Sequence, residues 1–328
     1  MKELQSLLVS GKPLFITIDG FRQAMLAAFP LNGKTPERPE VKFAFGMTKD
    51  EMLAYLNTHS WYQLESHLAL LDIQKVTNQE NTPITLTDEF SDEQLPDNSI
   101  AYHRVFGTVM SDSYYYFSSK QLQSDLLAAE ANPQISCHFL HVNSPGGEAW
   151  YLDRLSETLR SCEKPILTFY EQMCCSAGYY IGCHGQRIYA MTQNDYVGCI
   201  GTMCSFYDFE EYFAKLGIKK VEAKATKSDL KNKVFDDLRK GKDEQFVKDI
   251  LDPMNVQFLS EVRSQRSKIA DLPDDTPVLR GETFYTAQAV ELGLTDGCKT
   301  MTEAIVETST MGREYTEAKK LKTAVYNI

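Results

Sequence analysis

The sequence lacks any long hydrophobic run, and its first residues lack the pattern of a targeting signal. No window approaches the roughly 18 consecutive apolar residues of a membrane-spanning helix. The most apolar early stretch, residues 13–18, has only the length of a strand. The N-terminus has neither the basic start nor the apolar middle of a signal peptide. These absences predict a cytoplasmic chain without a membrane anchor.

The chain also lacks a surplus of positive charge. Its 34 Lys and Arg residues are outnumbered by 45 Asp and Glu residues, which gives a net charge of −11 over 328 residues. A nucleic-acid site needs a basic face that displaces counterions from phosphates. We therefore expect no nucleic-acid partner. With 43% hydrophobic and 24% charged residues, the composition is that of a globular protein.

Metal-binding and disulfide motifs are absent as well. The eight cysteines include no CxxC pair and lie among apolar neighbours, which is typical of reduced, buried thiols. None of the six histidines has a spacing that would pair it with a serine in a triad. We expect no metal site and no cofactor.

The chain divides into four predicted parts. Residues 1–87 form a small α+β region of unknown role, which includes an extended run at 14–18. Residues 88–97, of which five are acidic, predict a solvated linker. Residues 98–307 form the main domain. Residues 308–328 form a polar C-terminal tail that is either disordered or paired with another subunit.

Extended and helical runs alternate through the main domain, which predicts an α/β layered fold. The clearest helix lies at 148–162, where leucines recur every three or four residues with charged residues between them. We expect strands at 100–110, 135–142, 166–170, 187–190, 202–206 and 219–226, and helices at 119–131, 148–162, 176–183, 208–216 and 236–266, the last interrupted at Pro253.

A glycine pair follows the second of these strands. Gly146 and Gly147 end the run Asn-Ser-Pro-Gly-Gly and lie directly before the 148–162 helix. Glycines allow close approach by another chain, and the first amides of a helix favour negative charge. A developing oxyanion would fit at this turn, although a plain strand-to-helix connection has the same spacing.

Ser176 begins a second feature, Ser-Ala-Gly-Tyr-Tyr-Ile, at the start of a predicted helix. A serine at this position is most often a helix cap. To act as a nucleophile it needs a base, and a lysine whose charged form is disfavoured by burial can serve. The candidate lysines cluster after residue 219, where they could equally form a solvated basic patch: Lys224, Lys227, Lys231 and Lys233.

Five segments in a fixed order resemble the signal peptide peptidase A family of Ser/Lys peptidases, which includes phage capsid-maturation proteases. They are residues 139–147, 164–166, 176–181, 198–202 and 279–297. The resemblance extends over about residues 98–300. It implies a Clp-protease/crotonase-like fold built of repeated β-β-α units. It also implies a ring-shaped homo-oligomer, since members of the family form rings and some build each site from two subunits.

The resemblance also assigns roles to individual residues. Ser176 matches the nucleophile and Lys227 the general base, with Lys231 as the nearest rival. Gly147 and Ala177 match the residues whose amides form the oxyanion hole.

The resulting expectation is a soluble serine endopeptidase. A phage or prophage capsid-maturation enzyme associated with a procapsid is the specific form that the resemblance suggests. Polypeptide substrates would bind as extended strands beside the segments at Gly146 and Gly201. Two alternatives stay open: an acyl-CoA enzyme of the crotonase type, and a catalytically silent capsid or scaffold-associated protein with the same fold.

Overall fold

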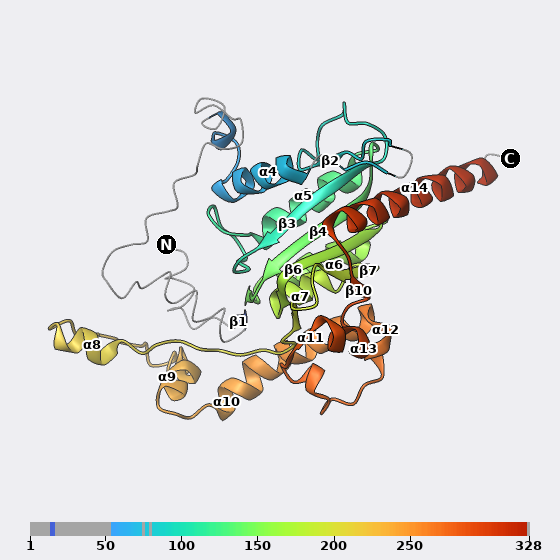
Figure 1. The fold of residues 1–328 in the computed structure, drawn as a ribbon. Helices are drawn as coiled ribbons and strands as arrows, with labels where there is room; N and C mark the ends of the chain where they lie inside the picture. Colours follow the sequence, from blue (N-terminus) through green and yellow to red (C-terminus); the bar gives the residue numbers. More distant parts are fainter. Residues whose placement is uncertain (1–13, 17–53, 74–75, 79–80, 327–328) are drawn as a thin grey trace.

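A computed structural model describes residues 14–16, 54–73, 76–78 and 81–326 (Figure 1). Its centre is a parallel sheet in the order β10-β7-β6-β4-β3-β2. The strands are β2 (Leu86–Thr87), β3 (Ser99–Phe106), β4 (Ile135–Ser144), β6 (Ile166–Cys175), β7 (Arg187–Ala190) and β10 (Gly297–Cys298). The parallel sheet and the alternation of strands with helices confirm the expected α/β class.

Two short strands extend the sheet where β6 finishes, and a third forms a separate two-stranded sheet after β4. β8 (Tyr196–Gly198) pairs in parallel with the last residues of β6, and β9 (Thr283–Tyr285) pairs antiparallel with β8. β5 (Gly146–Glu148) follows β4 after one residue and pairs antiparallel with β1 (Leu14–Ile16).

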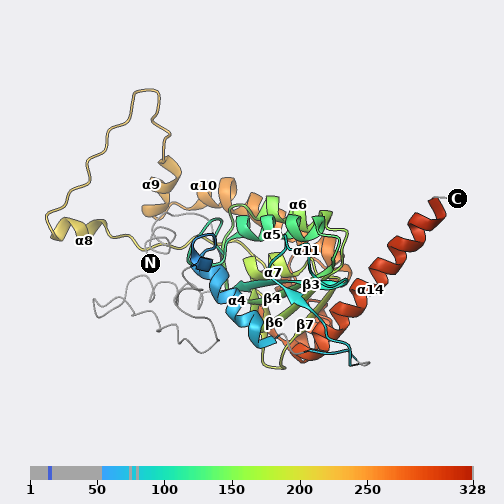
Figure 2. The ribbon, with the colours of Figure 1, turned by 90° about the horizontal axis from the view of Figure 1, so that it is seen from above.

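Helices cover both faces of the sheet, as Figure 2 shows. One face packs against α5 (Ser119–Ala131), α6 (Leu152–Ser161), α7 (Ala177–Gly182) and α11 (Asp252–Gln265). The other packs against α4 (Trp61–Ile73) and α14 (Met301–Tyr326). Alternation along β6 explains the two cores, because Tyr170 joins the first and Phe169 the second.

The remaining short helices follow β8 in the chain. They are α8 (Glu210–Lys215), α9 (Lys233–Arg239), α10 (Glu244–Phe246), a π-helical turn (Val247–Leu251), α12 (Ser267–Ala270), a 3-10 turn (Pro277–Leu279) and α13 (Thr286–Leu292). Residues 207–242, which we call the arm, extend away from the body and return at α10 (Figures 1 and 2).

Two predicted strands are wrong. Residues 202–206 contain only an isolated bridge at Met203, and residues 219–226 are irregular. The predicted helix over 236–266 is divided into four pieces. Pro253 is the second residue of α11, which directly follows the π-helical turn, so the helix changes its hydrogen-bond pattern just before the proline.

The acidic segment at 88–97 is attached to the body. Phe90 is buried against Ala129 and Ile135, and the Asn132 side chain donates hydrogen bonds to the backbone oxygens of Phe90 and Asp92. Leu70, Ile84 and Phe90 are therefore buried against strands of the sheet, whereas a solvated linker was expected at 88–97.

The C-terminal segment also differs from expectation, because α14 continues as a helix through residues 308–326. Thr308 and Ser309 are buried in this helix, which packs on β4. Among the described helices, none has the length and apolarity to cross a bilayer.

Candidate active site

Four of the sequence motifs meet where β4, β6 and β8 end. Ser144 pairs with Cys174, and Cys175 pairs with Gly198, so the strand ends lie side by side. The backbone N–H of Ser176 donates to the Gly198 oxygen at 2.8 Å. Antiparallel pairing of β8 with β9 adds the segment at 283–285. The carboxyl ends of parallel strands are where α/β folds place their sites.

Ser176 occupies a sharp turn between β6 and α7. Its backbone has φ 54° and ψ −121°, a left-handed conformation that is strained for a residue with a side chain. The residue is fully buried, and its Oγ has no hydrogen-bond partner among the described residues. Ser176 therefore does not cap α7, and its hydroxyl is held at a strand-to-helix turn as in enzymes with a serine nucleophile.

Close packing of α7 on β4 fixes this turn. A Cβ on Gly178 would lie 2.9 Å from the Ser144 Cβ, so only glycine allows the helix to approach so closely. The Ser144 hydroxyl donates to the Gly107 oxygen at 2.6 Å and accepts from the Gly146 N–H at 3.1 Å. This one serine therefore ties the end of β4 to the turn that leads into β5.

Positions 146 and 147 are glycine for different structural reasons. Gly146 has φ 103°, in the region that favours glycine. A Cβ on Gly147 would lie 2.1 Å from the Val109 oxygen, which no side chain tolerates. The Gly147 amide is thus held against a neighbouring segment on one side. Ala177, whose amide is the other predicted oxyanion donor, is the first residue of α7 and is fully buried.

The thiol next to Ser176 is a poor rival nucleophile. Cys175 is buried, and burial raises its pKa well above its ordinary value, so the reactive thiolate is disfavoured. The six histidines are also engaged elsewhere. His141, for example, pairs with the Tyr102 hydroxyl at 2.9 Å, and burial lowers its pKa to about 3.

The predicted bases lie on the arm, far along the chain from the nucleophile turn. Lys227 and Lys231 are both exposed, in the irregular connection between α8 and α9. The structure does not bring either lysine to Ser176 within this single chain, since the Ser176 Oγ has no partner among the described residues.

One buried lysine was not singled out by the sequence. Burial lowers the pKa of Lys164, as a lysine base requires, but its Nζ donates to the backbone oxygens of Ala129 and Asn132. Lys164 precedes β6 and Ser176 follows it. A strand of this length separates them by roughly 30 Å, so Lys164 cannot reach Ser176.

Gly201, predicted to contact substrate, follows β8 and is partly exposed. A Cβ there would meet Gly281 at an ordinary 3.7 Å, so packing does not require glycine at this position.

Two groups of potential metal ligands lie elsewhere. In the first, Glu130 accepts a hydrogen bond from His138 at 2.8 Å, and in the second His67 pairs with Asp88 at 3.0 Å. These hydrogen bonds explain why the side chains lie close together, so neither group requires a metal ion.

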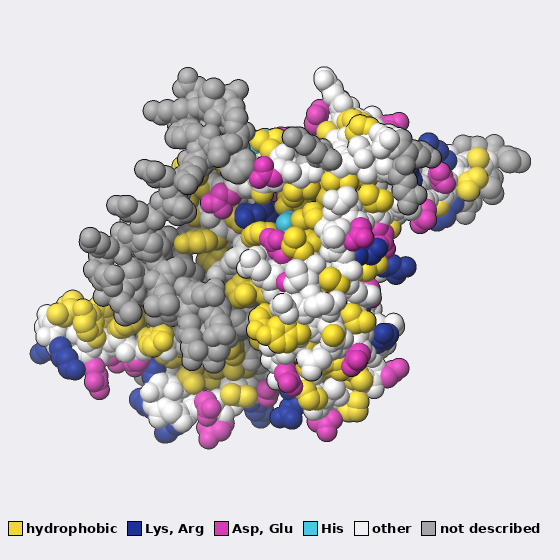
Figure 3. Space-filling view, in the orientation of Figure 1, with side chains coloured by type: hydrophobic (Ala, Val, Ile, Leu, Met, Phe, Trp, Pro, Cys, Tyr) yellow, Lys and Arg dark blue, Asp and Glu magenta, His cyan; other side chains and the backbone are white. Residues whose placement is uncertain are grey.

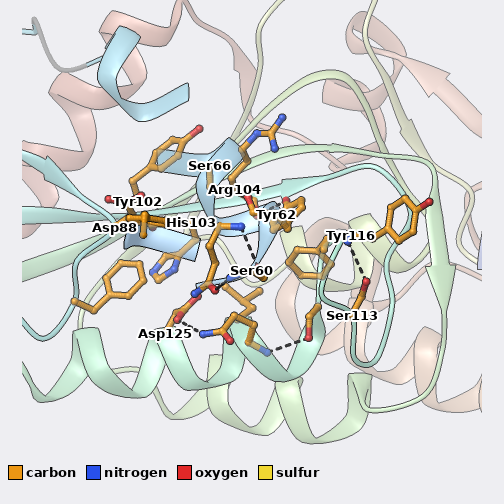
Figure 4. Close-up of a pocket in the computed structure, with 17 residues that line it drawn as sticks. Ser60, Tyr62, Ser66, Asp88, Tyr102, His103, Arg104, Ser113, Tyr116 and Asp125 are labelled. Atoms are coloured by element: carbon orange, nitrogen blue, oxygen red, sulfur yellow. Dashed lines mark hydrogen bonds between the residues drawn. The ribbon is translucent and has the colours of Figure 1, made fainter. Parts of the chain in front are cut away.

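A separate cavity lies between α4, β3 and α5 (Figure 4). Its volume is about 50 Å³, and its wall includes Tyr62, His103, Arg104 and Asp125. Burial raises the pKa of Asp125 to about 7. The cavity is too small for a peptide and Ser176 is not part of its wall, so it is not the candidate active site.

Residues 158–313 match the family model described as Peptidase family S49. This match extends over slightly less than half of the chain. The match includes Ser176, Lys227 and Lys231 and begins after the glycine pair. The S49 region therefore contains the strained serine turn.

Two proteins with similar sequences are named as peptidases. Protease 4 of Haemophilus influenzae is 26% identical over 66% of this chain and 37% of its own length. A putative signal peptide peptidase SppA of Enterococcus faecium is 23% identical over 70% of this chain and 68% of its own length. A Na(+)/H(+) antiporter NhaA of Brucella melitensis is 27% identical over 48% of this chain.

The chain spans 22% of the length of that antiporter and 37% of Protease 4. Among solved structures, the 1510-N membrane-bound stomatin-specific protease in complex with a substrate peptide has a TM-score of 0.41 at 12% identity, over 65% of this chain and 81% of that one.

Proposed function

We propose that this chain is a serine peptidase in which Ser176 is the nucleophile and Lys227 of a second copy is the general base. The proposal rests on the conformation and burial of Ser176. This residue lies in an S49 region, on a strained strand-to-helix turn, with a buried hydroxyl that has no partner among the described residues. A strained backbone of this kind is maintained by the surrounding packing and is concentrated at functional sites.

The reaction would proceed by acyl transfer. The Ser176 Oγ attacks the peptide carbonyl carbon, and its proton passes to a neutral lysine amine. The N–H groups of Gly147 and Ala177 stabilise the oxyanion, an interaction worth about 3 kcal/mol per donor. The lysine then gives its proton to the leaving amine, and water hydrolyses the acyl-enzyme with the lysine again accepting a proton.

The lysine has to be both close to Ser176 and removed from water, because a solvated ammonium cannot accept a proton. Within one chain Lys227 meets neither condition, since it is exposed on the arm. A second copy that covers the arm would supply both. We therefore place the dyad between two subunits, an arrangement that the family resemblance also implies.

The surface of the arm supports such an assembly. Figure 3 shows apolar side chains at its outer end, around α8. Tyr212, Ile218 and Val221 are 59%, 57% and 93% exposed. The arm also bounds a hollow of about 910 Å³ with Phe213 and Phe235 in its wall. An apolar surface of this kind is typical of a protein interface.

Substrates would be extended polypeptides. A substrate strand that paired with β5 at the glycine pair, along the edge that β1 occupies in this structure, would place a peptide carbonyl near the Gly147 amide. The family that the sequence resembles includes phage capsid-maturation proteases. The structural proteins of a phage head are therefore the first substrates to test.

Mixing two inactive variants tests the shared dyad. Ser176→Ala retains the lysine and Lys227→Ala retains the serine, so a co-assembled mixture contains some sites with both groups. Random assembly of a closed ring should restore about a quarter of wild-type peptide hydrolysis. An inactive mixture would mean that serine and base come from one chain.

Two substrate assays on the wild-type protein separate the alternatives. Turnover of a CoA thioester without peptide hydrolysis would favour the acyl-CoA enzyme. A folded oligomer that hydrolyses no peptide and reacts with no serine-directed phosphonate would favour the silent scaffold protein.

A further inference from the structure

The strand that carries the proposed oxyanion donor has two edges, and one is used within the body. The Val109 N–H donates to the Gly146 oxygen at 3.0 Å, and the Glu148 N–H donates to the Val109 oxygen at 2.8 Å. Backbone groups of successive residues in a strand point to opposite edges. The N–H and C=O of Gly147 therefore point to the other edge of β5.

That other edge is occupied by β1 from the N-terminal region. The pairing is antiparallel, with Phe15 opposite Gly147, Ile16 opposite Gly146 and Leu14 opposite Glu148. β1 also lies against α7, the helix that begins with Ala177. Residues 14–16 thus contact both elements whose amides form the proposed oxyanion hole.

The register of β1 is that of a peptide in position for attack. Because Phe15 is opposite Gly147, whose backbone groups face β1, the Phe15 carbonyl is the one directed at the Gly147 amide. Ser176 is fully buried at the start of α7, so a substrate reaches it only after a covering segment moves. β1 contacts both β5 and α7.

We propose that residues 14–16 act as an internal competitor of the substrate. They occupy the backbone position of an extended peptide at β5, and the active site opens when β1 leaves that edge. This inference rests on the proposed peptidase function. A tethered segment competes through its high effective concentration, yet three paired residues form a weak strand that a substrate can displace.

A matched pair of proline variants in the full chain tests the proposal. Phe15→Pro removes the N–H that faces Gly147 and breaks the pairing. Ile16→Pro removes an N–H that points away from β5, because Gly146 opposite it directs its oxygen to Val109. Proline is tolerated on the outer side of such an edge strand.

We expect Phe15→Pro to raise kcat/KM for an extended peptide about tenfold, and Ile16→Pro to leave it within about twofold of wild type. Equal rates in all three proteins, or an equal rise in both variants, would overturn the proposal. Melting temperatures of the two variants provide the check that both fold.

A binding measurement separates this inference from the peptidase proposal. In a Ser176→Ala background, a fluorescent peptide with the sequence of residues 12–18 should bind about tenfold more tightly when Phe15→Pro is added. This difference without hydrolysis by any Ser176-containing protein would support the competing strand and refute the peptidase. Hydrolysis that is identical with and without Phe15→Pro, together with unchanged peptide affinity, would support the peptidase and refute the competing strand.

Discussion

The nucleophile turn and the arm differ in how much the single chain constrains them. At the turn, added Cβ atoms on Gly147 and Gly178 would lie 2.1 and 2.9 Å from neighbouring atoms. On the arm, a Cβ on Gly217 or Gly241 would meet nothing within 4 Å. The chain alone thus fixes Ser176 and the proposed oxyanion donors, whereas the proposed lysine base would need a surface that another copy supplies.

The largest effect is expected from a change at the well-packed serine turn. Ser176→Ala should lower peptide hydrolysis by about four orders of magnitude or more, because no other described group can replace the hydroxyl. The melting temperature should stay close to wild type, since the lost oxygen has no hydrogen-bond partner among the described residues. Steady-state kinetics and thermal unfolding measure the two effects.

Cys175→Ser is the matched control for this test, because Cys175 directly precedes Ser176. Its hydrolysis should stay near the wild-type rate, because the buried thiol has a raised pKa and no role in the proposed reaction. Activity retained by Ser176→Ala and lost in Cys175→Ser would reverse the assignment of the nucleophile.

A change on the arm should give the next largest effect. Lys227→Ala should reduce kcat by about 10²- to 10⁴-fold, the usual contribution of a general base. The melting temperature of the dissociated monomer should not change, because the side chain is exposed in the single chain. Lys227→Arg should not restore activity, since a guanidinium stays protonated.

Lys231→Ala is the control on the same segment and should retain most activity. An inactive Lys231→Ala beside an active Lys227→Ala would place the base four residues later.

Gly147→Ala should affect both activity and stability. Its Cβ would collide with the Val109 oxygen, so β5 must move and carry the oxyanion donor with it. We expect kcat to fall about 10²- to 10³-fold, as for the loss of one oxyanion donor. Gly201→Ala is the control, since its Cβ would make only ordinary contacts. Equal stability and activity in both variants would contradict the geometry proposed for β5.

The smallest effect concerns stability alone. Glu261 on α11 pairs with His184 at 2.9 Å, just after α7, and with Arg160 on α6. Burial alone would raise the pKa of Glu261, but the hydrogen bonds from His184 and Arg160 outweigh it and lower the pKa to about 2. A depressed carboxyl pKa stabilises the fold above the unfolded value of about 4.3, and this stability is lost as the pH falls toward 2.

Glu261→Gln should therefore reduce the free energy of unfolding by about 1–3 kcal/mol at pH 7. The difference from wild type should shrink between about pH 5 and pH 2. Asp237→Asn, in an ion pair on the arm, should change the melting temperature little at any pH, because exposed ion pairs contribute little. A pH-independent loss in Glu261→Gln would mean that packing, not charge, explains the effect.

Local patterns in the sequence predict the body well and the arm only in part, since the helix expected at 208–216 is present as α8 but the strand expected after it is absent. The helix at 119–131 and the strand at 187–190 have the predicted bounds, since each buries one continuous apolar face or run. The strand predicted at 219–226 is wrong because its β-branched and apolar residues have no neighbouring strand to pair with in the part of the chain that the structure describes. Local propensity alone does not form a strand.

The site was predictable only in part. The order of the motifs singled out Ser176 and Gly147, and the extended run at 14–18 indicated a strand. The pairing of β8 with β9 and of β1 with β5 joins segments more than eighty residues apart. No local pattern encodes such partners, so neither the meeting of the motifs nor the occupied edge of β5 followed from the sequence.

Chemical labelling tests the central claim, that Ser176 is a nucleophile activated by a lysine, most directly. The assembled wild-type protein would be treated with a fluorophosphonate, and the modified residue would be mapped by peptide mass spectrometry. The account predicts a single adduct on Ser176 that is absent from Ser176→Ala and greatly slowed in Lys227→Ala. An adduct on another residue, or equal labelling of Ser176 in wild type and Lys227→Ala, would contradict it.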